Sequence, residues 1–230
     1  MEKYKSHFDD QLRKLAEKVM ILGGRSEEAI RQAVEAFQQK SAELALAVVD
    51  GDEDVDRMEV EIDHDCMELM ATRQPLARDF RLLATILKIT PELERVADLA
   101  VNIAERVKEI AQEGTSVGVG MVDIPAMADR SRAMLRDALT AFARADAAAA
   151  RAIIQLDSEM DDWMEHTFRV LVTHMLEDPR QITRALRHLM VAKNLERIAD
   201  HVTNMCEMIV YMCEGRIIRH MGDAGLDERR

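Results

Sequence analysis

The chain has 230 residues, of which 48% are hydrophobic and 32% charged, a balance that excludes intrinsic disorder. Its formal net charge of -12, with no continuous Lys/Arg stripe, disfavours binding to nucleic-acid phosphates. Aromatic residues (3%), Gly (9) and Pro (4) are sparse, so long helices are favoured over strands and turns, and we predict an all-α fold.

The N-terminal residues contain no apolar signal segment, and no apolar run approaches the ~20 residues of a membrane-spanning helix. The three cysteines are an odd number, which fits a reducing compartment. Cys206 and Cys213 lie two turns apart on one helical face, as core residues do. We therefore expect a cytoplasmic protein without direct membrane insertion.

Six helices are expected, in chain order, at residues 8–40, 41–73, 75–113, 125–144, 146–177 and 179–213. Pro75, Pro125 and Pro179 stand at helix starts, where proline is tolerated, and Asp123 and Asp178 can cap the helices that begin at Pro125 and Pro179. Gly51, between two aspartates, could interrupt the second helix locally.

An internal repeat organises the chain. Residues 93–105 read LERVADLAVNIAE, and residues 195–207 read LERIADHVTNMCE. A D-x-x-x-D motif precedes each copy by one helix. We therefore predict a tandem duplication of an antiparallel three-helix bundle, with repeats at residues 1–113 and 124–214, a linker at 114–123 and a frayed tail at 215–230.

Comparison of the repeats also decides how Pro91 should be interpreted. Thr90-Pro91-Glu92 has the form of a new helix start. The corresponding residues 192–194 contain no helix breaker. We therefore expect Pro91 to lie within one long helix and to kink it.

Each repeat carries a stripe of acidic and amide side chains beside apolar positions. At about 100° per residue, four residues of the third helix fall within about 80° of one another, and the sixth helix repeats the pattern. The two stripes consist of Glu94, Asp98, Asn102 and Glu105, and of Glu196, Asp200, Asn204 and Glu207.

The D-x-x-x-D pairs on the preceding helices should come level with these stripes. Asp56 lies about as far before the turn at Pro75 as Glu94 lies after it. The first converging set is Asp52, Asp56, Glu94 and Asp98, and the second is Asp157, Asp161, Glu196 and Asp200. Each like-charge pair weakens a helix by roughly 0.2–0.5 kcal/mol, and facing pairs cost more. Arg95 and Arg197 could supply some positive charge, but at about 100° from Glu94 and Glu196 they point away from the stripes. A bound cation would compensate this repulsion better.

Carboxylate ligands are hard, so iron, manganese, magnesium or calcium is favoured, and zinc is an alternative with His64 or His201 assisting. Acids near Gly51 could also be stabilised by a helix start alone, and acid pairs on solvated faces need no metal. Glu61-x-x-His64 has the spacing of half a di-iron carboxylate site, but no second copy matches it.

The doubled LER[VI]AD motif, with a D-x-x-x-D on each preceding helix, resembles the signatures of the PhoU family over residues 20–214. Ala97 and Ala199 stand where that family usually has Gly, and Pro91 is atypical for it. The resemblance implies two three-helix bundles with multinuclear metal clusters, with iron preferred and zinc, manganese or magnesium as alternatives. It assigns the two converging sets as metal ligands, with Asn102, Glu105, Asn204 and Glu207 in support.

The resemblance further implies a non-enzymatic regulator of phosphate uptake. Such a protein would form a homodimer and couple the phosphate ABC transporter ATPase to the membrane sensor histidine kinase. It would repress the phosphate-starvation response when phosphate is plentiful. The residues alone leave two alternatives open, which are a ferritin-like metal enzyme or metal-storage bundle, and a plain helical scaffold with solvated acids.

Overall fold

The computed structural model describes residues 2–112 and 122–218, and these contain helices and no strands. The elements are α1 (Glu2–Gln39), α2 (Ala42–Arg73), α3 (Ala77–Gln112), α4 (Ile124–Arg144), α5 (Ala147–Ile154), α6 (Asp157–Glu177), the short 3₁₀ helix η1 (Pro179–Gln181) and α7 (Ile182–Glu214). The all-α prediction is confirmed. Residues 113–121, which hold most of the predicted linker, and the tail from residue 219 lie outside the described residues.

Side-chain caps fix several of the helix starts. Ser41 accepts a hydrogen bond from the backbone N–H of Leu44 at the start of α2. Asp123 does the same at the start of α4, as the sequence predicts. Asp178 caps only η1, so the predicted sixth helix begins as a 3₁₀ turn, and α7 starts at Ile182 without a side-chain cap. The capping oxygens satisfy N–H groups that have no partner within the helix.

The predicted place of Pro75 at a helix start is wrong, because α3 begins at Ala77. Pro91 lies inside α3, so the expectation of one continuous helix is confirmed.

The predicted fifth helix is wrong as a single element, because the chain is interrupted at Gln155 and Leu156 between α5 and α6. The equivalent point in the first half is Gly51, where the sequence allows a local break and where α2 is nevertheless continuous. The interruption places Asp157 in the first turn of α6. The helix dipole favours a negative charge at that end, which partly offsets the desolvation of this carboxylate.

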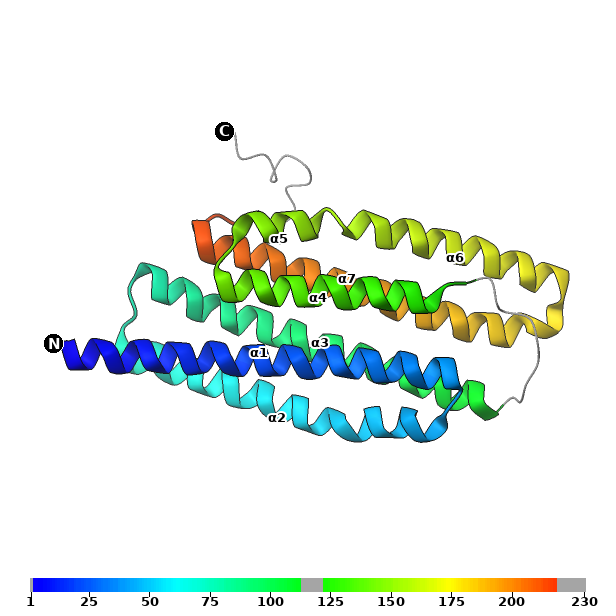
Figure 1. The fold of residues 1–230 in the computed structure, drawn as a ribbon, viewed down its shortest axis with the longest axis horizontal. Helices are drawn as coiled ribbons and strands as arrows, with labels where there is room; N and C mark the ends of the chain where they lie inside the picture. The colour runs from blue at the N-terminus through cyan, green and yellow to red at the C-terminus, as the bar shows by residue number, and fades with distance from the viewer. Residues whose placement is uncertain (1, 113–121, 219–230) are drawn as a thin grey trace.

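Each half places one helix at the centre of the molecule. α3 packs against α1, α2 and α7, and α7 packs against α3, α4, α5 and α6. Figure 1 shows the first-half helices in the lower part of the view and the second-half helices in the upper part. The α2–α3 turn and the α6–α7 turn lie at opposite ends of the elongated bundle (Figure 1).

Two buried serines tie the central helices to α1 and α4. The hydroxyl of Ser26 donates to the carbonyl of Leu93 at 2.9 Å, and that of Ser131 donates to the carbonyl of Leu195 at 3.1 Å. Both serines are fully buried. The accepting residues are the leucines that open the two repeated motifs. In each half, the same buried hydrogen bond therefore fixes the position of the acidic helix along the helix that carries the serine.

The contact between α3 and α7 joins the halves. The hydroxyl of Thr85 donates to the carbonyl of Met208, and the guanidinium of Arg81 donates to the carbonyl of Met212.

Among the described residues, no helix has the length and apolar character required to cross a membrane.

Candidate metal centres

The first candidate centre lies between α2 and α3, and we call Asp52, Asp56, Glu94 and Asp98 the first cluster. Burial, followed by the charges of Asp56 and Asp98, raises the pKa of Asp52 to about 6. Burial and Asp98 also raise the pKa of Glu94, with further contributions from Glu59 and Asp56. These carboxylates from two helices therefore lie close enough to disfavour each other's charge.

One sequence expectation about the first cluster is wrong. We expected Arg95 to point away from the acidic stripe. Its guanidinium instead lies 3.0 Å from Asp98 and 3.4 Å from Glu94. The helical angle sets only the direction of the Cα–Cβ bond, and the long arginine side chain curls back to the carboxylates. Because this guanidinium remains 60% exposed, it compensates the cluster only partly.

Access to the first cluster is provided by a pocket of about 330 Å³ between α1 and α2. Asp52 lines it together with Gly24 and Gly51, beside which a side chain would meet open space. A hydrated cation can therefore reach Asp52 from solvent through this pocket.

The second candidate centre lies between α6 and α7, and we call Asp157, Asp161, Glu196 and Asp200 the second cluster. Burial, followed by the charges of Glu196 and Asp157, raises the pKa of Asp200 to about 6. Burial and Asp161 raise the pKa of Asp157, and a hydrogen bond from Thr203 opposes that rise. The repeat thus places the same arrangement of carboxylates in both halves.

Glu196 is the most informative residue of the second cluster. It is only 9% exposed, and its Oε1 accepts a bond of 2.6 Å from the ammonium of Lys193. Within the described part of the chain, its Oε2 is buried without any hydrogen-bond partner. A buried, unpartnered carboxylate oxygen costs several kcal/mol unless something positive satisfies it, and a metal ion in the second cluster would do so.

Neither cluster is compact as the structure stands. Among the described residues, three potential ligand atoms come within 4.8 Å of one another only at His64, Asp65 and Glu68. Like-charged carboxylates with no ion between them repel, and some turn to basic neighbours, as Glu196 does to Lys193.

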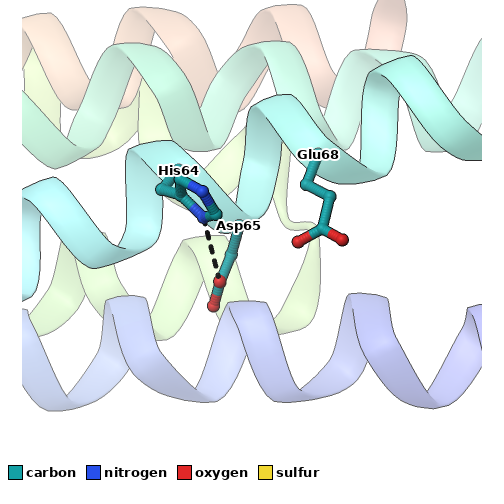
Figure 2. A group of neighbouring side chains, drawn as sticks. All are labelled: His64, Asp65 and Glu68. Atoms are coloured by element: carbon teal, nitrogen blue, oxygen red, sulfur yellow. Dashed lines mark ion pairs between the residues drawn. The ribbon is translucent and has the colours of Figure 1, made fainter.

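The group at His64 has a simpler explanation than a metal. Figure 2 shows His64 and Asp65 directed toward each other on α2, with an ion-pair distance of 3.9 Å. The carboxylate of Asp65 is already paired with the ammonium of Lys18 at 2.7 Å. The side chain of His64 is 76% exposed, so it neither assists the first cluster nor forms part of a buried di-iron site. We interpret this group as a solvated ion-pair network.

The expected supporting residues divide into two groups. Asn102 and Glu105 are exposed on α3, and Glu207 is partly buried on α7. The amide of Asn204 donates to Glu92 of α3 at 3.2 Å instead of to the second cluster. His201, considered as a zinc ligand, also lies 2.6 Å from Glu92. Both residues therefore join the halves, and this role could not be seen in one helix alone.

The raised pKa values of Asp52 and Asp200 predict a pH dependence for the metal-free protein. The folded state keeps protons between about pH 4 and 6 that the unfolded chain releases, so these groups destabilise the fold as pH rises through that window. The variant Asp52→Asn with Asp200→Asn should therefore gain stability over the wild type from pH 4.5 to 6.5. Urea unfolding measures this difference, and a pH-independent difference would contradict it.

The comparisons with known proteins all lead to one family. The PhoU domain matches residues 19–107 and again residues 124–209. The chain is 39% identical to the phosphate-specific transport system accessory protein PhoU homolog of Pseudomonas putida, over 94% of this chain and 84% of that protein. It is 36% identical to the phosphate-specific transport system accessory protein PhoU of Escherichia coli K12, over 96% and 91% respectively.

Two solved structures share the fold. The crystal structure of PhoU from Pseudomonas aeruginosa has a TM-score of 0.86 and 35% identity, covering 91% of this chain and all of that one. The phosphate transport system regulatory protein PhoU from Streptococcus pneumoniae has a TM-score of 0.83 and 27% identity, covering 91% and 98%.

Proposed function

This chain belongs to the PhoU family, and on that premise we propose that it is a cytoplasmic regulator of phosphate uptake that binds metal ions at its two acid clusters. Its relatives are named accessory or regulatory proteins, which supports a non-enzymatic role. The metal proposal rests mainly on Glu196, whose Oε2 is buried and finds no hydrogen-bond partner within residues 2–112 and 122–218.

The donor set fits a hard cation. Each cluster offers four carboxylates from two helices, and such oxygen ligands suit iron, manganese or magnesium, with zinc as an alternative. A bound ion would hold α2 against α3 and α6 against α7, and it would relieve the repulsion that raises the pKa of Asp52 and Asp200. Four carboxylates at one place can bridge neighbouring ions, so we propose multinuclear sites.

The regulatory proposal concerns the protein's partners. We expect a homodimer that contacts the ATPase of the phosphate transporter and the membrane sensor histidine kinase, and that represses the starvation response when phosphate is plentiful. The names of the relatives connect them to phosphate transport, and this chain matches them along most of its length.

Co-purification tests this proposal. The chain, expressed at native level in cells grown with and without phosphate, should retain the transporter ATPase and the kinase, with a ratio that changes with phosphate supply. Loss of the chain should also release a starvation-response reporter from repression in phosphate-rich medium. Absence of both partners together with an unchanged reporter would refute the regulatory role.

A further inference from the structure

The two halves differ at one place on the outer side of their equivalent helix pairs. In the first half, Asp63 of α2 and Lys88 of α3 occupy this place, and Lys88 is exposed. The repeat offsets of 105 and 102 residues put Phe168 and Met190 at the same positions in the second half. Both are 50% exposed. The duplication thus supplies an internal comparison in which a polar pair has become a large apolar one.

Helical geometry extends this apolar pair into a strip. Phe168, Val172 and Leu176 lie within about 60° of Asp161 on α6 at about 100° per residue. Ile182, Leu186 and Met190 lie about 40–120° from Glu196 on α7. Asp161 and Glu196 mark the sides on which these two helices face each other at the second cluster, so both series follow the same side of the helix pair. We call these six residues the apolar strip.

The strip has three levels. α6 ends at Glu177 and α7 begins at Ile182, so residues at equal distances from this turn lie level on the two antiparallel helices. Phe168 lies nine residues before Glu177, and Met190 lies eight residues after Ile182. The same count brings Val172 level with Leu186 and Leu176 level with Ile182. Apolar side chains spaced four apart on both helices form a shallow seam between them.

The exposure of the strip requires an explanation. Leu176 is 80% exposed, Leu186 45% and Ile182 41%. With Phe168 and Met190, these residues present roughly 400 Å² of apolar surface, the size at which a patch on a soluble protein is often a binding site. They belong to the parts of α6 and α7 next to the α6–α7 turn, which Figure 1 shows at the right-hand end of the bundle.

The area indicates what covers the strip. A stable protein–protein interface needs about 800 Å² per partner, which is about twice what the strip offers to a second copy of this chain. A single amphipathic helix fits better, because its side chains at i, i+4 and i+7 match three levels spaced by one helical turn.

The charge around the strip indicates the character of that helix. Residues 165–197 carry six Lys and Arg against four Asp and Glu, a net charge of +2 in a chain whose net charge is -12. The equivalent residues 60–95 of the first half carry five against seven, a net charge of -2. The part of the second-half hairpin that carries the strip, residues 165–197, therefore has a small excess of positive charge beside its apolar side chains, and it favours a negatively charged partner.

We propose that the apolar strip is a docking seam for an acidic amphipathic helix of a partner protein. In the first half the equivalent levels are Asp63 with Lys88, Met67 with Ala84, and Ala71 with Phe80, so one level is polar and each of the other two has a single large apolar side chain. The seam does not depend on metal, so its test is separate from that of the acid clusters.

The first half also supplies the test variant. Phe168→Asp with Met190→Lys installs the residues that the fold already accepts at the equivalent positions and leaves the net charge unchanged. The matched control is Ile21→Lys with Leu46→Asp, two residues of similar exposure outside the strip. Circular dichroism and thermal melting should show that both variants keep the wild-type fold.

The probe is a fluorescently labelled synthetic peptide that forms a helix, with Leu at alternating third and fourth positions and Glu and Ala elsewhere. Its binding is measured by fluorescence anisotropy in the presence of a metal chelator. A second peptide carries Lys in place of Glu. The wild type and the control variant should bind the acidic peptide at least tenfold more tightly than Phe168→Asp/Met190→Lys does. They should also bind it at least tenfold more tightly than the lysine peptide.

Three results would overturn the proposal. Equal binding of the acidic peptide by the wild type and Phe168→Asp/Met190→Lys would exclude the strip as its site. Conversion of a wild-type dimer to monomers by that variant, seen in sedimentation, would assign the strip to a second copy of the chain. Binding to vesicles of anionic phospholipid that the same variant abolishes would assign it to a membrane surface.

Discussion

Untagged protein carrying Asp98→Asn and Asp200→Asn is expected to lose at least half of its bound metal, because one carboxylate ligand is removed from each cluster. The neutral amides also remove charges that face Asp52 and Asp157 across the helices. The metal-free variant should therefore be more stable at pH 7 than the metal-free wild type, although the metal-loaded wild type should exceed both. Elemental analysis and thermal melting measure the two effects.

Two features make this result specific. A control variant with Asp65→Asn and Glu68→Gln removes as many carboxylates from the exposed group at His64, and it should keep its metal. The stability of the metal-free forms separates a ligand role from a solvated surface role, since neutralising a solvated acid changes stability little. Equal metal content in the wild type and the Asp98→Asn/Asp200→Asn variant would contradict the assignment of both clusters.

Gly23→Ala is expected to destabilise the protein, whereas Gly24→Ala should stabilise it. A Cβ on Gly23 would lie 2.5 Å from Leu139 Cδ2 and 3.1 Å from its Cγ, at the contact between α1 and α4 that joins the halves. Leu139 is 5% exposed and has little room to move. Overpacking of about 1–3 kcal/mol outweighs the helix-propensity gain of about 1 kcal/mol.

Gly24 is the matched control for this change. A Cβ there meets nothing within 4 Å, so Ala should add about 0.5–1 kcal/mol to the free energy of unfolding. Leu139→Ala alone should cost about 2–4 kcal/mol, and Gly23→Ala combined with it should cost less than the sum, because the clash is gone. Urea unfolding of the four variants measures this coupling. If the losses of unfolding free energy for Gly23→Ala and Leu139→Ala are additive, a Cβ at position 23 and the Leu139 side chain do not clash.

The parts of the site that depend on helical periodicity could be predicted from the sequence. Glu94 and Asp98 share a face because they are four residues apart, and counting residues to the turn near Pro75 placed Asp52 and Asp56 level with them. The metal itself stays a prediction. The equivalence of the two buried serines could also have been predicted. Ser26 and Ser131 are 105 residues apart, which is the separation of the two D-x-x-x-D motifs.

The remaining features depend on contacts that no single helix encodes. His201 and Asn204 contact Glu92 because α3 and α7 pack together, and that packing does not follow from the pattern of either helix. The sequence around the helix interruption at Leu156 contains no Gly or Pro that would predict it. Gly51, at the equivalent position of the first half, would predict an interruption but lies within a continuous helix. Arg95 reaches back to Asp98 because a long side chain is not confined to the direction of its Cβ.

Anomalous diffraction from crystals of the untagged protein, recorded at the iron, manganese and zinc absorption edges, tests the central claim most directly. The account predicts a peak between α2 and α3 within coordination distance of Asp52 and Asp98. It predicts another between α6 and α7 within reach of Glu196 Oε2 and Asp200. Anomalous density confined to His64, Asp65 and Glu68, or absent from both clusters in protein that contains metal by elemental analysis, would contradict it.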